Sequence, residues 1–184
     1  MLMQPLNHQQ GVGLVEVLVA LLLLAVAVLG FSAMQMTAIK ATEESVMRTR
    51  AMTIMRGGAE VMRANPSGIA AFKAALNGTP IVTGITKDSC LTNDATFNAN
   101  KNCSIEELAT RDALLMKSYA ADNDLQIAMI PNGCPGTQGN QERQCFIASW
   151  GDTKTELSAS DANACAYLDG TYKNGAECFI MEAY

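Results

Sequence analysis

The stretch GVGLVEVLVALLLLAVAVLG, residues 11–30, decides the fold of this chain, because it is a long apolar run with one carboxylate near its start. No charged residue occurs from Val17 to Ile39, a run of 23 residues. As a helix, this run is long enough to cross the roughly 30 Å hydrocarbon core of a bilayer. An ionised Glu at the centre of that core costs about 2.5–3.5 kcal/mol, so Glu16 is a candidate functional residue. The alternative is that Glu16 lies at the membrane interface, with its carboxylate among the headgroups.

A cleaved secretory signal is the alternative to a retained membrane helix. Such a signal has a positively charged leader and a small-residue cleavage site after its apolar run. Residues 1–11, MLMQPLNHQQG, contain no Lys or Arg, and the segment that ends the run, GFSAMQMTAIK (30–40), holds only FSA as a weak cleavage site. The sequence therefore favours a helix that stays in the membrane.

The rest of the 184-residue chain has the composition of one ordinary soluble domain. The net charge is −5, and the 13 Lys and Arg residues are scattered along the sequence. Because nucleic-acid binding needs a basic stripe to contact phosphates, this composition argues against a nucleic-acid partner.

The cysteines indicate an oxidising compartment, because an even number of them lies on one side of the apolar run. Six cysteines allow 15 connectivities. The spacing favours neighbours, which pairs Cys90 with Cys103, Cys134 with Cys145, and Cys165 with Cys178. The alternatives are reduced cysteines in a cytosolic domain and, more weakly, a zinc site, for which no C-x-x-C motif is present.

Helical periodicity continues beyond the apolar run, where the sequence becomes amphipathic from Lys40 onward. No proline occurs between Val12 and Asn65, so the pattern predicts one helix from Leu14 to Ala64 that ends before Pro66. The pair Gly57-Gly58 weakens this helix locally and is a candidate bend.

The middle of the chain predicts a short helix within residues 67–80, followed by a strand over 80–85, PIVTGI. Ser104 and Glu107 have the spacing of a capping box, which marks the start of a helix of about four turns. Its predicted apolar face consists of Ile105, Leu108, Leu115 and Tyr119.

Residues 125–131 and 144–150 read as two strands of an antiparallel hairpin, with turn residues between them. The tail from Cys165 to Tyr184 repeats this plan, with two short apolar runs around a turn rich in Gly and Asn. A long helix followed by hairpins predicts an α+β fold in which an antiparallel sheet covers the apolar face of the helix.

The sequence holds little that could perform catalysis. The one histidine, His8, lies within the first 11 residues, and no phosphate-binding loop or nucleophile motif is present. The acidic segments 122–124 and 151–152 are more typical of turns than of calcium sites, and the sequons at Asn77 and Asn102 are short matches that recur by chance. We expect no metal, no cofactor and no enzyme activity.

The segment GVGLVEVLVALLLL (11–24) resembles the class III signal of type IV pilins and type II secretion pseudopilins. In that family a polar leader ends in Gly, a hydrophobic residue follows, and Glu is the fifth mature residue. The resemblance implies that a prepilin peptidase cuts between Gly11 and Val12 and methylates the new terminus at Val12. It also implies that Glu16 is an assembly residue. Its carboxylate would pair with the amine of Val12, in the same subunit or in a neighbouring one.

Three further segments are similar to PilV-type minor pilins. They are GGAEVMRANP (57–66), CSIEELATRDALLMKSY (103–119), and LQIAMIPNGCPG…CFIASWGD (125–152), which ends in Ser149, Trp150 and Asp152. The resemblance implies a type IV pilin fold with a leader (1–11), a transmembrane and assembly half of the long helix (12–39), and a periplasmic head (40–184).

By this resemblance the chain is a minor pilin that primes pilus assembly, with a part in cell adhesion and twitching motility. Its implied partners are other minor pilins, the major pilin, a tip adhesin, the prepilin peptidase and the inner-membrane assembly platform. It is held in the inner membrane before assembly and lies at or near the pilus tip afterwards. The alternatives are a minor pseudopilin of a type II secretion system, a subunit that binds DNA or a surface, and a membrane-anchored enzyme.

Overall fold

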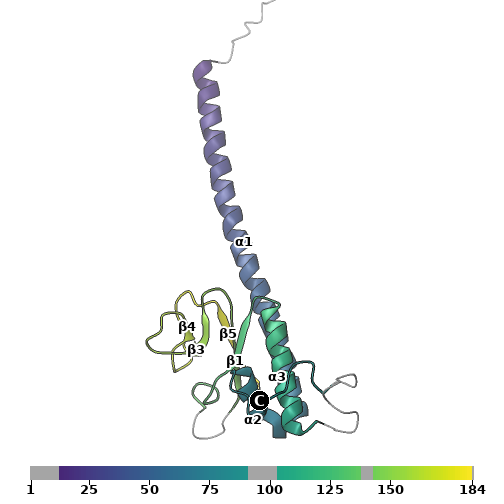
Figure 1. The fold of residues 1–184 in the computed structure, drawn as a ribbon. Coiled ribbons are helices and arrows are strands. Elements are labelled where there is room, and N and C mark those ends of the chain that lie inside the picture. Colours follow the sequence, from purple (N-terminus) through teal and green to yellow (C-terminus); the bar gives the residue numbers. More distant parts are fainter. Residues whose placement is uncertain (1–12, 91–102, 138–142, 184) are drawn as a thin grey trace, which may run out of the picture. The chain divides into compact units, whose positions relative to one another are not determined.

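The computed structural model describes residues 13–90, 103–137 and 143–183, and the chain comprises two compact units, Met1–Glu43 and Glu44–Tyr184 (Figure 1). The predicted α+β fold, a long helix followed by an antiparallel sheet, is confirmed. The helices are α1 (Leu14–Ala64), η1 (Pro66–Gly68), α2 (Ile69–Leu76) and α3 (Ile105–Ala121). The strands are β1 (Gln126–Met129), β2 (Cys145–Ser149), β3 (Lys154–Leu157), β4 (Ala164–Ala166) and β5 (Cys178–Glu182).

Helix α1 has the predicted bounds, Leu14 to Ala64. In the unit Met1–Glu43, every described residue of α1 is exposed, and the segment is almost wholly apolar. Within the described residues, α1 is the one helix long and apolar enough to cross a membrane, judged by length and composition. The helix ends where sequence requires it, because Asn65 precedes Pro66 and adopts a non-helical backbone.

In the unit Glu44–Tyr184, α1 buries one face at helical spacing, formed by Ala51, Met55, Gly58, Ala59 and Met62. A Cβ at Gly58 would lie 2.5 Å from Met116 and 2.9 Å from Phe146, so any larger residue there would force these side chains to shift. The helix runs through the Gly57-Gly58 pair, and the close approach of Met116 and Phe146 explains the second glycine. The pair, which the sequence suggested as a bend, is therefore a packing position at Gly58.

The capping box of α3 is confirmed, because the Glu107 backbone N–H donates to Ser104 Oγ and the Ser104 N–H donates to Glu107 Oε2. The predicted apolar face of α3 is not its buried face: Ile105 is 49% exposed and Tyr119 57% exposed. The buried residues are instead Ala109, Thr110, Ala113, Met116 and Ala120. These are mostly small, which permits close packing between α3 and its neighbours.

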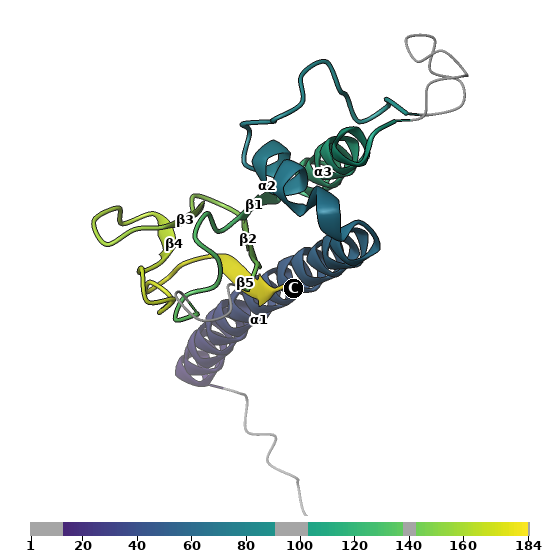
Figure 2. The same ribbon diagram turned by 90° about the horizontal axis from the view of Figure 1, so that it is seen from below.

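Helix α2 falls within the predicted range 67–80 and lies beside α3 in both views (Figures 1 and 2). Where the chain enters α2, a Cβ at Gly68 would lie 2.8 Å from the Cβ of Ala109, so the two segments nearly touch. Phe72 of α2 packs edge-to-face on Phe146 of β2, with ring centroids 6.2 Å apart. This contact joins the helices to the sheet.

The three-stranded sheet has the order β1-β2-β5, and both pairings are antiparallel. The predicted hairpin is β1 and β2, which pair from Gln126 with Ser149 to Met129 with Phe146. All five residues of β2 are buried, because both faces of the central strand are covered. Phe146 and Ala148 join the core with α1, α2 and α3, whereas Cys145 and Ile147 join a second core with β4. The sheet thus separates the helices from the β3–β4 pair (Figure 2).

Two predicted strand arrangements are wrong. Residues 80–85 form bends rather than a strand, and most of their side chains are exposed. The tail does not form a second hairpin, because β5 pairs with β2 while β4 pairs in parallel with β3. The only trace of the expected hairpin in the described residues is an isolated antiparallel bridge between Ala166 and Tyr172. Strand β5 pairs with β2 over five residues, whereas β4 has only three residues and could offer β5 a shorter pairing.

Candidate assembly site

Glu16 lies in the first turn of α1, and its side chain is exposed. Its backbone N–H donates to the carbonyl of Gly13 over 2.9 Å, so the helix is already formed at this residue. The positive end of the helix dipole favours a carboxylate there. Among the residues that the structure describes, the Glu16 side chain has no hydrogen-bond or ion-pair partner, and the predicted processing residues Gly11 and Val12 lie outside those residues.

The hydroxyl groups in the apolar segment form hydrogen bonds to backbone carbonyls of the same helix. Ser32 Oγ donates to the carbonyl of Val28 over 2.8 Å, and Thr37 Oγ1 donates to that of Ala33 over 3.1 Å. A polar group in hydrocarbon must find its partner inside the protein, and these side chains do so without any other chain. Glu16 is the only ionisable group between residues 13 and 39, and none of the described residues pairs with its carboxylate.

The apolar side chains of α1 between residues 14 and 39 form a continuous exposed surface. The least exposed of the large ones, Val17, still shows 47% of its surface, and Leu14 shows 77%. A soluble protein rarely exposes a contiguous apolar patch of this size. This part of α1 therefore requires an apolar environment, which lipid or other helices can supply.

Three disulfides close the second unit, and they join the pairs that the spacing favours. The Cα atoms are 5.9 Å apart in Cys90–Cys103, 4.9 Å in Cys134–Cys145 and 5.8 Å in Cys165–Cys178. The second disulfide staples the base of the β1–β2 loop, and the third joins β4 to β5 and so links the two sheets. These bonds fit an oxidising compartment.

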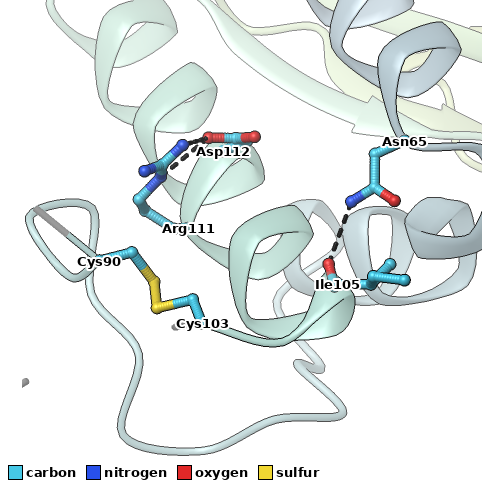
Figure 3. Close-up of polar contacts among 6 residues, drawn as sticks. All are labelled: Asn65, Cys90, Cys103, Ile105, Arg111 and Asp112. Carbon is cyan, nitrogen blue, oxygen red and sulfur yellow. Dashed lines mark hydrogen bonds and ion pairs between the residues drawn. A yellow bond between two sulfur atoms is a disulfide. The ribbon is translucent and has the colours of Figure 1, made fainter. Parts of the chain in front are cut away.

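A hydrogen bond joins the residue after α1 to the start of α3 (Figure 3). The Asn65 amide donates to the Ile105 carbonyl over 3.0 Å, and further along α3 Arg111 donates to its neighbour Asp112 through two nitrogens. Figure 3 shows the Cys90–Cys103 disulfide close to the start of the same helix. Of these contacts, the Asn65 hydrogen bond joins the end of α1 to α3, whereas Arg111 and Asp112 are neighbours within α3.

The side chain of Asn77 serves the fold. Its Oδ1 accepts from the Met129 N–H over 2.8 Å, and its Nδ2 donates to the Met129 carbonyl over 2.9 Å. The amide therefore takes the place of a neighbouring strand at the open edge of β1. The Asn77 side-chain nitrogen of this sequon is therefore engaged in a hydrogen bond that supports the fold. Asn102, the other sequon residue, lies outside the described residues.

A group of charged side chains at the β3–β4 pair was not anticipated from sequence. The Lys154 ammonium donates to Asp161 Oδ2, and Lys173 donates to the Asp161 carbonyl while lying 4.8 Å from the centroid of the Tyr167 ring. The hydrogen bond from Lys154, together with the Asn163 backbone N–H, lowers the pKa of Asp161 from 3.8 to about 2. This group fixes a loop, because all of its members lie between residues 154 and 173.

The acidic segments considered for calcium form turns. Asp122 ends α3, Asp124 has a positive φ of 58°, and residues 151–152 form the turn after Trp150. In the described parts of the chain, no three His, Cys, Asp or Glu side chains gather closely enough to hold a metal ion.

Two family models match the chain in adjoining ranges. The model for the prokaryotic N-terminal methylation motif matches residues 6–32, and that described as type IV pilin Tt1218 matches residues 33–114. The first range holds Gly11, Val12 and Glu16, and the second holds the rest of α1, α2 and half of α3. No curated protein and no solved structure matches the chain.

Proposed function

The chain is a type IV pilin-family protein with a class III prepilin signal, and from this premise we propose that it is a minor subunit of the type IV pilus. The observation that carries the proposal is the exposed apolar half of α1 with one unpaired carboxylate, Glu16, ahead of a disulfide-closed head. The leader is residues 1–11, the membrane and assembly segment is 12–39, and the head is 40–184.

Before assembly, the apolar segment holds the protein in the inner membrane with its head in the periplasm. The prepilin peptidase cuts between Gly11 and Val12 and methylates the new amine. Moving this segment from lipid into a fibre keeps its side chains in apolar surroundings, so the transfer does not expose them to water. The carboxylate of Glu16 then pairs with the amine of Val12, because two buried opposite charges are far less costly together than either is alone.

Motifs of the head support a pilus role over a pseudopilin role. The segments 57–66, 103–119 and 125–152 resemble PilV-type minor pilins, which prime fibre growth with other minor pilins and a tip adhesin. In this role the subunit engages the assembly platform and the major pilin and lies at or near the tip. A minor pseudopilin of a type II secretion system would have the same signal and the same helix.

The proposal is tested by processing and incorporation. The native chain should have the mass of residues 12–184 plus one methyl group. The substitutions Glu16→Ala and Glu16→Gln should leave this mass change intact and remove the protein from sheared pili, measured by immunoblot. The matched control Glu43→Ala, on an exposed carboxylate of the same helix, should leave incorporation unchanged.

Three results would contradict the proposal. A mature chain that retains residues 1–11 would show an ordinary membrane anchor. Normal amounts of the Glu16→Ala protein in pili would show that the carboxylate has no part in assembly. Loss of protein secretion with intact pili, after deletion of the chain, would favour the pseudopilin role.

A further inference from the structure

The sequence contains three Asn-Gly pairs, which begin at Asn77, Asn132 and Asn174. In such a pair the backbone nitrogen of the glycine can attack the side-chain carbonyl of the asparagine, because glycine has no side chain to obstruct the approach. The attack needs a glycine N–H that is not held in a hydrogen bond and an asparagine side chain that can rotate. The two reacting residues are the same in all three pairs, so the fold decides which pair meets these conditions.

The pair at Asn77 is closed to this reaction at both groups. The Gly78 N–H donates to the Ala75 carbonyl over 3.1 Å. The Asn77 amide accepts from the Met129 N–H over 2.8 Å and donates to the Met129 carbonyl over 2.9 Å. Three hydrogen bonds must therefore break before the Gly78 nitrogen can reach the side chain of Asn77.

The pair at Asn132 is closed at the glycine. Gly133 is buried, and its N–H donates to the Ile130 carbonyl over 3.3 Å in the turn that follows β1. The Asn132 side chain is exposed and has no hydrogen-bond partner among the residues that the structure describes. The carbonyl under attack is therefore accessible, but the attacking nitrogen is engaged.

The pair at Asn174 is open at both groups. Asn174 and Gly175 are exposed and are the central residues of a turn, which the Ala176 N–H closes by donating to the Lys173 carbonyl over 3.1 Å. Gly175 has a φ of 75°, as the third residue of a type II turn does. The peptide group between the two central residues takes no part in the closing bond. Within the described parts of the chain, neither the Gly175 N–H nor the Asn174 amide has a partner.

The space around this turn is open as well. A Cβ built at Gly175 would meet no atom within 4 Å, so water can approach the reacting groups. Asn174 is thus the one of the three asparagines at which the attacking nitrogen, the carbonyl and the solvent are all available.

We propose that Asn174 is a site of spontaneous deamidation, and that it reacts ahead of Asn77 and Asn132. The Gly175 nitrogen forms a bond to Cγ of Asn174, the Cγ–Nδ2 bond breaks, and ammonia leaves with the proton that the Gly175 nitrogen gives up. Water then opens the cyclic imide: breaking the bond to Cγ gives aspartate, and breaking the bond to the main-chain carbonyl gives isoaspartate. The reaction needs only water, so it is independent of the proposed function.

Both products put a carboxylate at residue 174, in the connection between β4 and β5. Isoaspartate also lengthens the main chain within the turn, which disrupts the hydrogen bond between Ala176 and Lys173. The Cys165–Cys178 disulfide joins the strands on either side of this connection, so the connection stays attached to the sheet after the reaction. The modification therefore changes the charge and the local backbone of the head without releasing a segment.

The test is incubation of the full-length chain in detergent, in water labelled with heavy oxygen, at neutral and at mildly alkaline pH. Mass spectrometry of peptides, after a brief acidic digestion, follows the three pairs separately, and the label marks deamidation that occurred during the incubation. Asn174 should react roughly tenfold faster than Asn132, the factor that corresponds to breaking one ordinary hydrogen bond before the attack. Asn77 should react more slowly than both, and the rate at Asn174 should rise with pH, because the attacking nitrogen must lose its proton.

The unfolded chain is the matched control. In urea with reductant, the three pairs should react at similar rates, because the hydrogen bonds that distinguish them are absent. In the folded chain, Asn174→Gln should nearly abolish the labelled product at this position, since the longer side chain would have to form a larger and less favourable ring. The same variant should leave the rates at Asn77 and Asn132 unchanged.

Three results would overturn the inference. The first is a folded chain that deamidates at Asn77 or Asn132 as fast as at Asn174. The second is an Asn174 that stays intact while the unfolded chain reacts at all three pairs. The third is an unfolded chain that keeps the rate ratios of the folded one, since sequence and not structure would then set the order. None of these results bears on the pilus role, which is tested by processing and by the Glu16 variants.

Discussion

At the residue scale, the adjacent glycines of α1 are glycines for different reasons. Gly57 is exposed, and a Cβ there meets nothing, whereas a Cβ at Gly58 collides with Met116 and Phe146. Gly57→Ala should therefore raise the free energy of unfolding by about 0.5–1 kcal/mol, since alanine is the better helix former. Gly58→Ala should lower it by about 1–3 kcal/mol through overpacking. Urea titrations of the two full-length variants in detergent measure both, and equal effects would contradict the packing at Gly58.

Asp161 predicts a dependence of stability on pH. The hydrogen bond from Lys154 lowers the folded pKa of Asp161 to about 2, below its ordinary value of 3.8. The contact therefore contributes its full stability above the unfolded pKa, and this contribution is lost as the pH falls from about 4 to 2. Asp161→Asn should lower the thermal midpoint at pH 7 and have a much smaller effect at pH 2, where the folded carboxyl is about half protonated.

The partner of Asp161 supplies the control for that experiment. In a Lys154→Gln background, Asp161→Asn should have a smaller effect at pH 7, because the main cause of the pKa shift is already absent. Thermal midpoints at pH 7, 4 and 2 for the four chains complete the cycle. A difference between wild type and Asp161→Asn that stays constant with pH would contradict the assignment.

At the element scale, two of the disulfides form a matched pair. Cys90–Cys103 and Cys165–Cys178 both span 13 residues, so loop entropy gives each about 3 kcal/mol. Cys165 and Cys178 are almost fully buried and join the two sheets, whereas Cys90 and Cys103 are partly exposed. Replacing both cysteines by Ala should therefore cost about 1–2 kcal/mol more in the second pair, because a cavity remains in the core. Urea midpoints measured without reductant test this, and equal losses would contradict it.

The elements that the sequence misplaced share one property: they are short, and their neighbours are distant in sequence. Strand β3 alternates exposed and partly buried residues in a charged segment, so no apolar run marks it. Strand β5 pairs with β2, some 30 residues earlier, rather than with β4, its neighbour in the chain. Which face of α3 is buried likewise depends on how closely α1 and α2 approach it. That distance cannot be predicted from residue type alone.

At the scale of the whole molecule, we expect the part of α1 up to Glu43 to be dispensable for folding of the unit Glu44–Tyr184, because the first buried residue of α1 is Ala51. A chain that begins at Glu44 should be soluble without detergent and have a thermal midpoint within a few degrees of the full-length protein. A chain that begins at Gly57 should fail to fold, since it lacks Ala51 and Met55, and a buried Met alone contributes about 2–5 kcal/mol. Circular dichroism on both truncations measures this, and a stable shorter chain would contradict it.

The sequence by itself determined the features that depend on nearby residues. An uncharged run, a proline, a capping box and a turn between two apolar runs are local signals, and they were sufficient for α1, the start of α3 and the β1–β2 hairpin. The prepilin signal around Glu16 is local as well, and so the family could be identified before any fold was known.

Only the tertiary structure decided what each surface packs against. It put the small residues of α3 inside and left its Ile105 and Tyr119 exposed, packed Gly58 against Phe146, and paired β5 with β2. The physical reason is that burial depends on the distance between elements. That distance is set by many contacts between residues that are far apart in the sequence. The hollow between α1 and α3 exists for the same reason, because its walls come from two helices that are far apart in the sequence.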